Sequence, residues 1–188
     1  MTKLIGLAGS LRRASHNAAL LRLAAATMPA GNELIIASID GIPLYNSDDE
    51  QERGLPASVV RLKSAIADSD GLVIATPEYN NGVPGVLKNA IDWLSRPAGD
   101  IPRMFGGKPI ALCSASAGQF GGVLAQAHWL PVLRHLGAAH WSGSRLVLPR
   151  AHLAFDAEGG LKDPVVAEQI AAFFADFLDF VARRGSDR

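Results

Sequence analysis

The segment LIGLAGSLRRASHNAALL, residues 4–21, decides how this chain folds. Its first part, Leu4 to Ala8, is an uninterrupted apolar run typical of a buried strand, and its last part, Ala18 to Leu21, is typical of a helix. The polar residues 9–17 join the two. A helix that begins just after a strand offers unpaired backbone N–H groups and the positive end of its dipole. The segment therefore predicts an anion-binding site at the start of a helix.

The loop within this segment carries the side chains that a bound phosphate requires. Hydroxyls, an amide and a guanidinium are supplied by Ser10, Ser15, Asn17 and Arg12 or Arg13. No acidic residue precedes Glu33, so this end of the chain presents only positive side chains. The alternative is that Ser15 or Asn17 only caps the first helix. One cap needs one oxygen, and the four candidate ligands favour binding.

Composition limits the class of protein. The chain has 188 residues, of which 48% are apolar and 19% charged, and this predicts a single globular domain over residues 1–188. The 18 basic and 18 acidic residues cancel, which disfavours a nucleic-acid-binding protein and an electron carrier steered by strong charge. The single Cys113 excludes an internal disulfide and predicts the reducing cytoplasm. We expect neither a signal peptide nor a membrane-spanning segment.

Strands and helices alternate along the whole chain. Apolar runs predict strands at 4–8, 33–39, 72–75, 109–113 and 144–148, and helical spacing predicts helices at 15–28, 56–70, 84–94, 123–136 and 164–184. Residues 40–54, 97–107 and 149–163 show no period and are predicted to be irregular, the first of them a long surface loop. This pattern predicts an α/β three-layer sandwich with a five-stranded parallel sheet in the flavodoxin-like order 2-1-3-4-5. In that order the loops after strands one, three and four line one cleft.

Two further loops at that edge of the sheet have the composition of a binding site. The loop after the third strand contains Pro77, Glu78, Tyr79, Asn80 and Asn81, which combine a stiff backbone, an aromatic ring and amides. These groups suit the face and the edge of a flat heterocycle, although a turn before a helix that begins at Pro84 is the simpler alternative. The loop at 114–122 is rich in small residues, so its backbone and Ser116 can approach a ligand closely.

The first loop lacks the glycine pattern of two common nucleotide sites. Positions 9, 11 and 14 are Gly, Leu and Ala, so the dinucleotide fingerprint is absent, and no Gly-Lys-Ser/Thr follows to make a Walker loop. What remains suits a terminal phosphate monoester, which is the group that FMN carries.

Other candidate residues are explained more simply by structure. The five histidines show no paired spacing for a metal, so no metal site is predicted, and Cys113 at the end of a buried strand is expected to be inert. Polar residues on the helix after Pro84 are interpreted as its solvated face, with an oligomer contact around Trp93 as the alternative; they are Lys88, Asn89, Asp92 and Arg96.

Taken together, the sequence resembles the NADPH-dependent FMN reductase family of flavodoxin-like proteins, in particular its chromate and quinone reductase branch. Three segments carry the resemblance: GSLR with Ser15 and Asn17 at 9–17, PEYN running on to LKNAIDWLSR at 77–96, and Ser116, Gly118 and the Gly pair at 121–122. The second segment is long and specific, and the likeness spans nearly the whole chain.

The resemblance implies a set of cofactor-binding residues. It places the FMN phosphate at Ser10, Arg12, Ser15 and Asn17. It places the flavin ring beside Pro77, Glu78, Tyr79, Asn80 and Asn81, with Ser116 contacting it from the third loop. It also implies hydride transfer from NADPH or NADH through FMN to a small-molecule acceptor such as a quinone, chromate, an azo dye, a nitroaromatic or free flavin. The flavin carries that chemistry, so no catalytic acid or base is predicted, and a homodimer or homotetramer is expected.

Three other classes of protein with a related α/β architecture are the alternatives to a flavin reductase. A non-enzymatic flavodoxin-type electron carrier would also bind FMN, but the neutral charge counts against it. A receiver-type signalling domain needs acids at the ends of the first and third strands, where this chain has Gly9-Ser10 and Thr76-Pro77. A short-chain nicotinamide enzyme needs the glycine fingerprint that is missing here.

Overall fold

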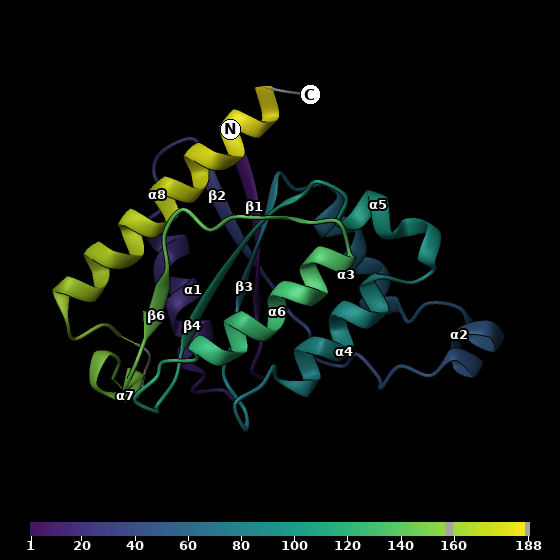
Figure 1. Ribbon diagram of the computed structural model, residues 1–188, viewed down its shortest axis with the longest axis horizontal. Helices are drawn as coiled ribbons and strands as arrows, with labels where there is room; N and C mark the ends of the chain where they lie inside the picture. Colours follow the sequence, from purple (N-terminus) through teal and green to yellow (C-terminus); the bar gives the residue numbers. More distant parts are fainter. Residues whose placement is uncertain (157–159, 187–188) are drawn as a thin grey trace.

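A computed structural model describes residues 1–156 and 160–186, and the chain forms a parallel sheet between two layers of helices (Figure 1). The strands are β1 (Thr2–Ala8), β2 (Asn32–Ala37), β3 (Gly71–Ala75), β4 (Pro109–Ala115), β5 (Ala139–His140) and β6 (Leu146–Leu148). The longer helices are α1 (His16–Ala26), α3 (Ala57–Ala67), α4 (Gly85–Leu94), α6 (Val123–His135) and α8 (Pro164–Ser186). Shorter ones are α2 (Ser47–Arg53), the 3-10 turn η1 (Ala98–Asp100), α5 (Ile101–Met104) and α7 (Ala151–Ala154).

The sheet has the predicted order, β2-β1-β3-β4-β5, and all of its pairs are parallel. Every residue of β3 and β4 is buried, because helices cover both faces of the sheet. This is why both strands are continuous apolar runs and could be recognised as central strands. The predicted α/β flavodoxin-like fold is confirmed.

Successive residues of a strand point to opposite faces of the sheet and pack into two separate hydrophobic cores. On β3, Val73 packs with α1 and α8, whereas its neighbour Ile74 packs with α3, α4 and α6. Two phenylalanines of α8 lie in the first of these cores: Phe173 and Phe177 are buried and both contact Trp141. The apolar face of α8 therefore packs on the sheet. Among the residues that the structure describes, no helix is long and apolar enough to cross a membrane.

The edge of the sheet beside β4 differs from the prediction, which placed one strand there over residues 144–148. It is divided between β5 and β6, which both pair with β4, so the sheet contains a sixth short strand. The chain leaves the sheet between them near Gly143, where an added Cβ would lie 2.5 Å from Trp141 Nε1. A strand of two residues is too short to give an alternating pattern, and β5 was missed for that reason.

The three segments predicted to be irregular each contain a short helix. Residues 40–54 hold α2, residues 97–107 hold η1 and α5, and residues 149–163 hold α7. None of these helices is long enough to show an apolar period, and α2 has no buried residue. A capping signal was nevertheless present for α2: Asn46 Oδ1 accepts from Asp48 N at 3.0 Å, and acids fill the first turn.

Candidate functional site

The three polar loops meet at the carboxyl edge of the sheet, as the strand order predicts (Figure 1). Gly9 N, at the start of the first loop, donates to Ala75 O at 2.8 Å and so ties this loop to the end of β3. Gly9 is buried, and a Cβ added to it would lie 2.8 Å from Pro77 Cδ and from Leu87 Cδ2. The first and second loops therefore approach so closely that only glycine fits between them.

The first loop leads into α1 through a side-chain cap. Ser15 Oγ accepts from Ala18 N at 3.2 Å, and Ser15 is buried. The capping alternative thus accounts for the Ser15 hydroxyl in this structure. Ser10 remains half-buried and Arg12 exposed, with the Arg12 guanidinium donating to Ala14 O at 2.6 Å. The first turn of α1 has no acidic residue, so nothing on the helix opposes an anion there.

Asn17 is placed in the interior and joins two parts of the site. Its Nδ2 donates to Ala115 O at 2.8 Å, and its Oδ1 accepts from Ala115 N at 3.0 Å. Asn17 is 2% exposed. The amide therefore links the start of α1 to the end of β4, where the third loop begins, and the sequence offered no signal for this partner.

The second loop turns sharply at its two asparagines. Tyr79 and Gly82 exchange backbone hydrogen bonds of 3.1 and 2.9 Å, with Asn80 and Asn81 between them at φ of 50° and 61°. Asparagine tolerates this left-handed region better than most residues, which explains the pair. Tyr79 is 48% exposed, and its hydroxyl donates to Ser10 Oγ at 3.2 Å. The phenol therefore bridges the second loop to the first.

Glu78 connects the second loop to α6. One of its carboxylate oxygens accepts from Leu124 N at 2.9 Å and from Ala125 N at 3.2 Å. The residue at the N-cap position of α6 is Gly122, which has no side chain to serve the helix, so the carboxylate caps it from a distant point in the chain. Thr76 is held from the same helix, because Trp129 Nε1 donates to its hydroxyl at 3.0 Å.

The third loop packs tightly because of its glycines. Gly121 and Gly122 have φ of 63° and 97°, and an added Cβ would lie 2.5 Å from Val147 Cγ1 and 2.8 Å from Ser114 Cβ, respectively. Ser116 is half-buried, and its hydroxyl accepts from Gly118 N at 3.3 Å. The structure therefore brings nine of the ten predicted residues to the three loops and places the tenth, Asn17, behind them.

The titratable groups do not form an acid–base or metal site within the described ranges 1–156 and 160–186. No group of three or more histidine, cysteine or acidic side chains is arranged to hold a metal there. Burial raises the pKa of the Cys113 thiol above its ordinary value, so this cysteine stays protonated in the core. The site is a cradle of hydroxyls, amides, a phenol and a guanidinium.

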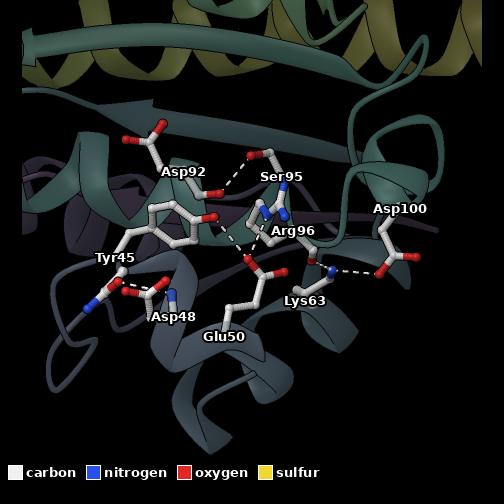
Figure 2. Close-up of polar contacts among 9 residues, drawn as sticks. Tyr45, Asp48, Glu50, Lys63, Asp92, Ser95, Arg96 and Asp100 are labelled. Carbon is white, nitrogen blue, oxygen red and sulfur yellow. Dashed lines mark hydrogen bonds and ion pairs between the residues drawn. The ribbon is translucent and has the colours of Figure 1, made fainter. Parts of the chain in front are cut away.

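Residues 42–54, which we call the strap, cross over α4 and form a contact that the sequence interpretation missed (Figure 2). Tyr45 N donates to Asn89 Oδ1 at 2.8 Å, and Pro43 O accepts from Asn89 Nδ2 and Trp93 Nε1 at 2.9 and 2.8 Å. The interpretation of this helix face as merely solvated is wrong for Asn89 and for Arg96, which also contacts the strap. Lys88 and Asp92 form a half-exposed ion pair of 2.7 Å.

An ion pair holds the end of the strap (Figure 2). One Glu50 oxygen accepts from Arg96 Nε at 2.8 Å and from the Tyr45 hydroxyl at 2.9 Å. The hydrogen bond from Arg96 lowers the pKa of Glu50 below its ordinary value of 4.5. The contact is therefore complete above that ordinary value and is lost as pH falls through the lowered one. Lys63 Nζ fixes the same corner by donating to Arg96 O and pairing with Asp100 at 2.6 Å.

Removing the Glu50 carboxylate is expected to loosen the strap without unfolding the sheet. In Glu50→Ala, backbone amides in residues 43–53 should exchange with deuterium about tenfold faster, because α2 has no buried residue to hold it. Asp92→Ala is the matched control, since it breaks the Lys88 pair within α4 and leaves the hydrogen bonds between Glu50, Arg96 and Tyr45 in place. Equal exchange in wild type and Glu50→Ala would show that the ion pair does not anchor the strap.

Comparison with known proteins agrees with this architecture. Residues 2–153 match the family model described as NADPH-dependent FMN reductase. The chain is 44% identical over 168 residues to an NAD(P)H-dependent FMN reductase of Pseudomonas aeruginosa, with 89% of each chain covered. It is 36% identical over 186 residues to a 2-hydroxy-1,4-benzoquinone reductase of a Burkholderia species, covering 99% of this chain and 97% of the relative.

A solved structure shows the same fold at a similar level of identity. The flavoenzyme NAD(P)H:(acceptor) oxidoreductase of Paracoccus denitrificans superposes with a TM-score of 0.85 at 34% identity, covering 97% of this chain and 98% of that one. The family match extends from β1 into α7 and includes all three loops of the site. The chain therefore belongs to the NADPH-dependent FMN reductase family.

Proposed function

We propose that this chain binds FMN in the cleft between its three loops and uses it to pass reducing equivalents from NADPH or NADH to a quinone or a similar small acceptor. The observation that carries the proposal is the meeting of the loops at the edge where such sheets bind ligands. Pro77 leaves no room for a side chain at Gly9, and the Tyr79 hydroxyl donates to Ser10 Oγ. The named relatives, a flavin reductase and a benzoquinone reductase, support the same reaction class.

The first loop has the donor set that a phosphate monoester needs. We assign this group to Ser10, Arg12 and the backbone at Ser15, where the N-terminus of α1 adds its dipole. The Arg12 guanidinium lies at the surface, from which it can swing to a ligand, and charge-assisted hydrogen bonds of this kind are the strong ones. Asn17 is assigned to the same cradle as a positioning residue, because its amide holds Ala115.

The second and third loops would border the flavin ring. Pro77 is buried against Gly9 and stiffens the wall, while Tyr79, Asn80 and Asn81 are exposed at its rim. Glu78 holds this wall to α6, and Ser116 would contact the ring from the third loop. Bound FMN supplies the hydride chemistry, so the protein's task is to orient the ring and leave one face open to the nicotinamide and then to the acceptor.

A second copy of the chain would complete the cleft as a homodimer or homotetramer. Phe120 on the third loop and Leu44 on the strap are 62% and 84% exposed, and a second copy packed against them would bury both apolar side chains. The cytoplasm is the proposed compartment, where reduced nicotinamide is available and the Cys113 thiol is kept reduced.

The test records the flavin absorbance while the bound FMN is first reduced and then reoxidised. Purified protein with FMN should lose its yellow colour when NADPH is added without oxygen, and regain it when benzoquinone follows. Bleaching that benzoquinone does not reverse would favour another acceptor among chromate, azo dyes, nitroaromatics and free flavin. Flavin binding with no bleaching by either nicotinamide would contradict the proposal and favour the non-enzymatic electron carrier.

A further inference from the structure

A cavity of about 310 Å³ lies beside the first loop. Its described lining comes from residues 12–15 of that loop, from α1, and from His152, Phe155, Asp156 and Lys162. The residues that we assign to the flavin ring are not in this lining. The cavity shares Arg12 and Ser15 with the phosphate cradle, and its other described lining residues are not assigned to FMN.

The cavity is strongly basic. Its described lining contains four basic side chains, Arg12, Arg13, Arg22 and Lys162, against one carboxylate, Asp156. One Asp156 oxygen already accepts from Gly160 N at 2.6 Å. Within residues 1–156 and 160–186, no ion pair involves any of the four cations. This excess of basic side chains in the described lining favours a ligand with more than one negative charge.

The cavity also offers a flat, neutral surface. His16 stacks on Phe155 with ring centroids 6.1 Å apart and an interplanar angle of 21°. Burial, with Arg12 and His152 nearby, lowers the pKa of His16 from its ordinary value of 6.5, so its ring is uncharged at pH 7. His16, Ala19 and Arg22 of α1 all line this cavity. A planar base and a dianion would thus meet the ring and the guanidinium on the same wall.

NADPH carries that combination at the end of the molecule remote from its nicotinamide. It differs from NADH only in a phosphate monoester on the adenosine 2′-hydroxyl. We propose that this cavity binds the adenosine 2′-phosphate end of NADPH, with Arg13 and Arg22 as the residues that select NADPH over NADH. The inference rests on the proposed function, because the nicotinamide must reach a flavin held by the three loops.

The test uses the FMN-loaded protein and two readouts. By calorimetry, adenosine 2′,5′-bisphosphate should bind wild type at least about tenfold more tightly than adenosine 5′-monophosphate, and Arg22→Ala should remove this difference. By steady-state kinetics, Arg22→Ala and Arg13→Ala should each raise the KM for NADPH about tenfold and change the KM for NADH less than about twofold. Arg61→Ala, an exposed arginine on α3, is the matched control and should change neither.

Three results would overturn the inference. Equal changes in the KM for NADPH and NADH would show that the arginines do not read the 2′-phosphate. Loss of FMN affinity in Arg22→Ala would assign the cavity to the cofactor's own phosphate. Equal affinity of wild type for the two adenosine phosphates would leave the cavity without a role in selection. Failure of the proposed function is distinguishable, since wild-type protein would then bind no FMN or would hold FMN that neither nicotinamide bleaches.

Discussion

Asn17→Ala is expected to destabilise the protein by about 2–4 kcal/mol before any cofactor is added. The substitution removes both hydrogen bonds to the backbone of Ala115 and leaves that buried N–H and C=O without partners. Each unsatisfied buried group costs about 1–3 kcal/mol. Because Ala115 lies at the end of β4, the third loop should also lose its position.

Urea unfolding of the FMN-free protein measures this effect. Ser10→Ala is the matched control from the same loop: its hydroxyl is half-buried, so stability should change by less than about 0.5 kcal/mol while FMN affinity falls. If Asn17→Ala weakened only FMN binding and left unfolding unchanged, Asn17 would be a simple ligand and not the link that we describe.

Gly9→Val is expected to separate the first two loops and to lower FMN affinity by about 100-fold or more. A side chain here would start 2.8 Å from Pro77 Cδ and Leu87 Cδ2 and 3.1 Å from Pro84 Cγ, and the two proline rings have little freedom to move. Overpacking of this kind costs about 1–3 kcal/mol in stability. The larger loss should be in binding, because the proposed phosphate and ring sites belong to the two loops that this contact joins.

The control for this change is Gly85→Ala, at a helical glycine where an added Cβ would meet nothing within 4 Å. Its FMN affinity should equal that of wild type, and its stability should be unchanged or slightly higher. The measurement is a fluorescence titration of each protein with FMN. Wild-type affinity in Gly9→Val would show that the loops can part without harm to the site.

The parts of the fold that the sequence predicted are those with local signals. Buried parallel strands such as β3 appear as continuous apolar runs, and their order then brings the first, second and third loops together. The short elements α2, α7 and β5 carry no period and were missed. For α2, Asn46 and the acids after it were a usable capping signal that apolar periodicity alone ignores.

The roles of individual site residues were harder to predict, because their partners are remote in the chain. Asn17 bonds a residue 98 positions away, and Glu78 caps a helix that begins more than 40 residues later. Asn80 and Asn81 were predicted as ring contacts, and the structure adds a backbone reason for their identity. The ion pair of the strap could not be predicted for the same reason. Glu50 and Arg96 are also remote in the chain, and they come into contact only in the folded protein.

The proposed phosphate cradle is tested by comparing FMN with riboflavin, which has the same ring and no phosphate. Fluorescence titration of the FMN-free protein should give one FMN site per chain and an affinity for riboflavin at least about 100-fold weaker, since two or more charge-assisted hydrogen bonds are lost. In Ser10→Ala this preference should shrink. Equal affinity for the two flavins, or no binding of either, would contradict the central claim that the loop after β1 cradles the FMN phosphate.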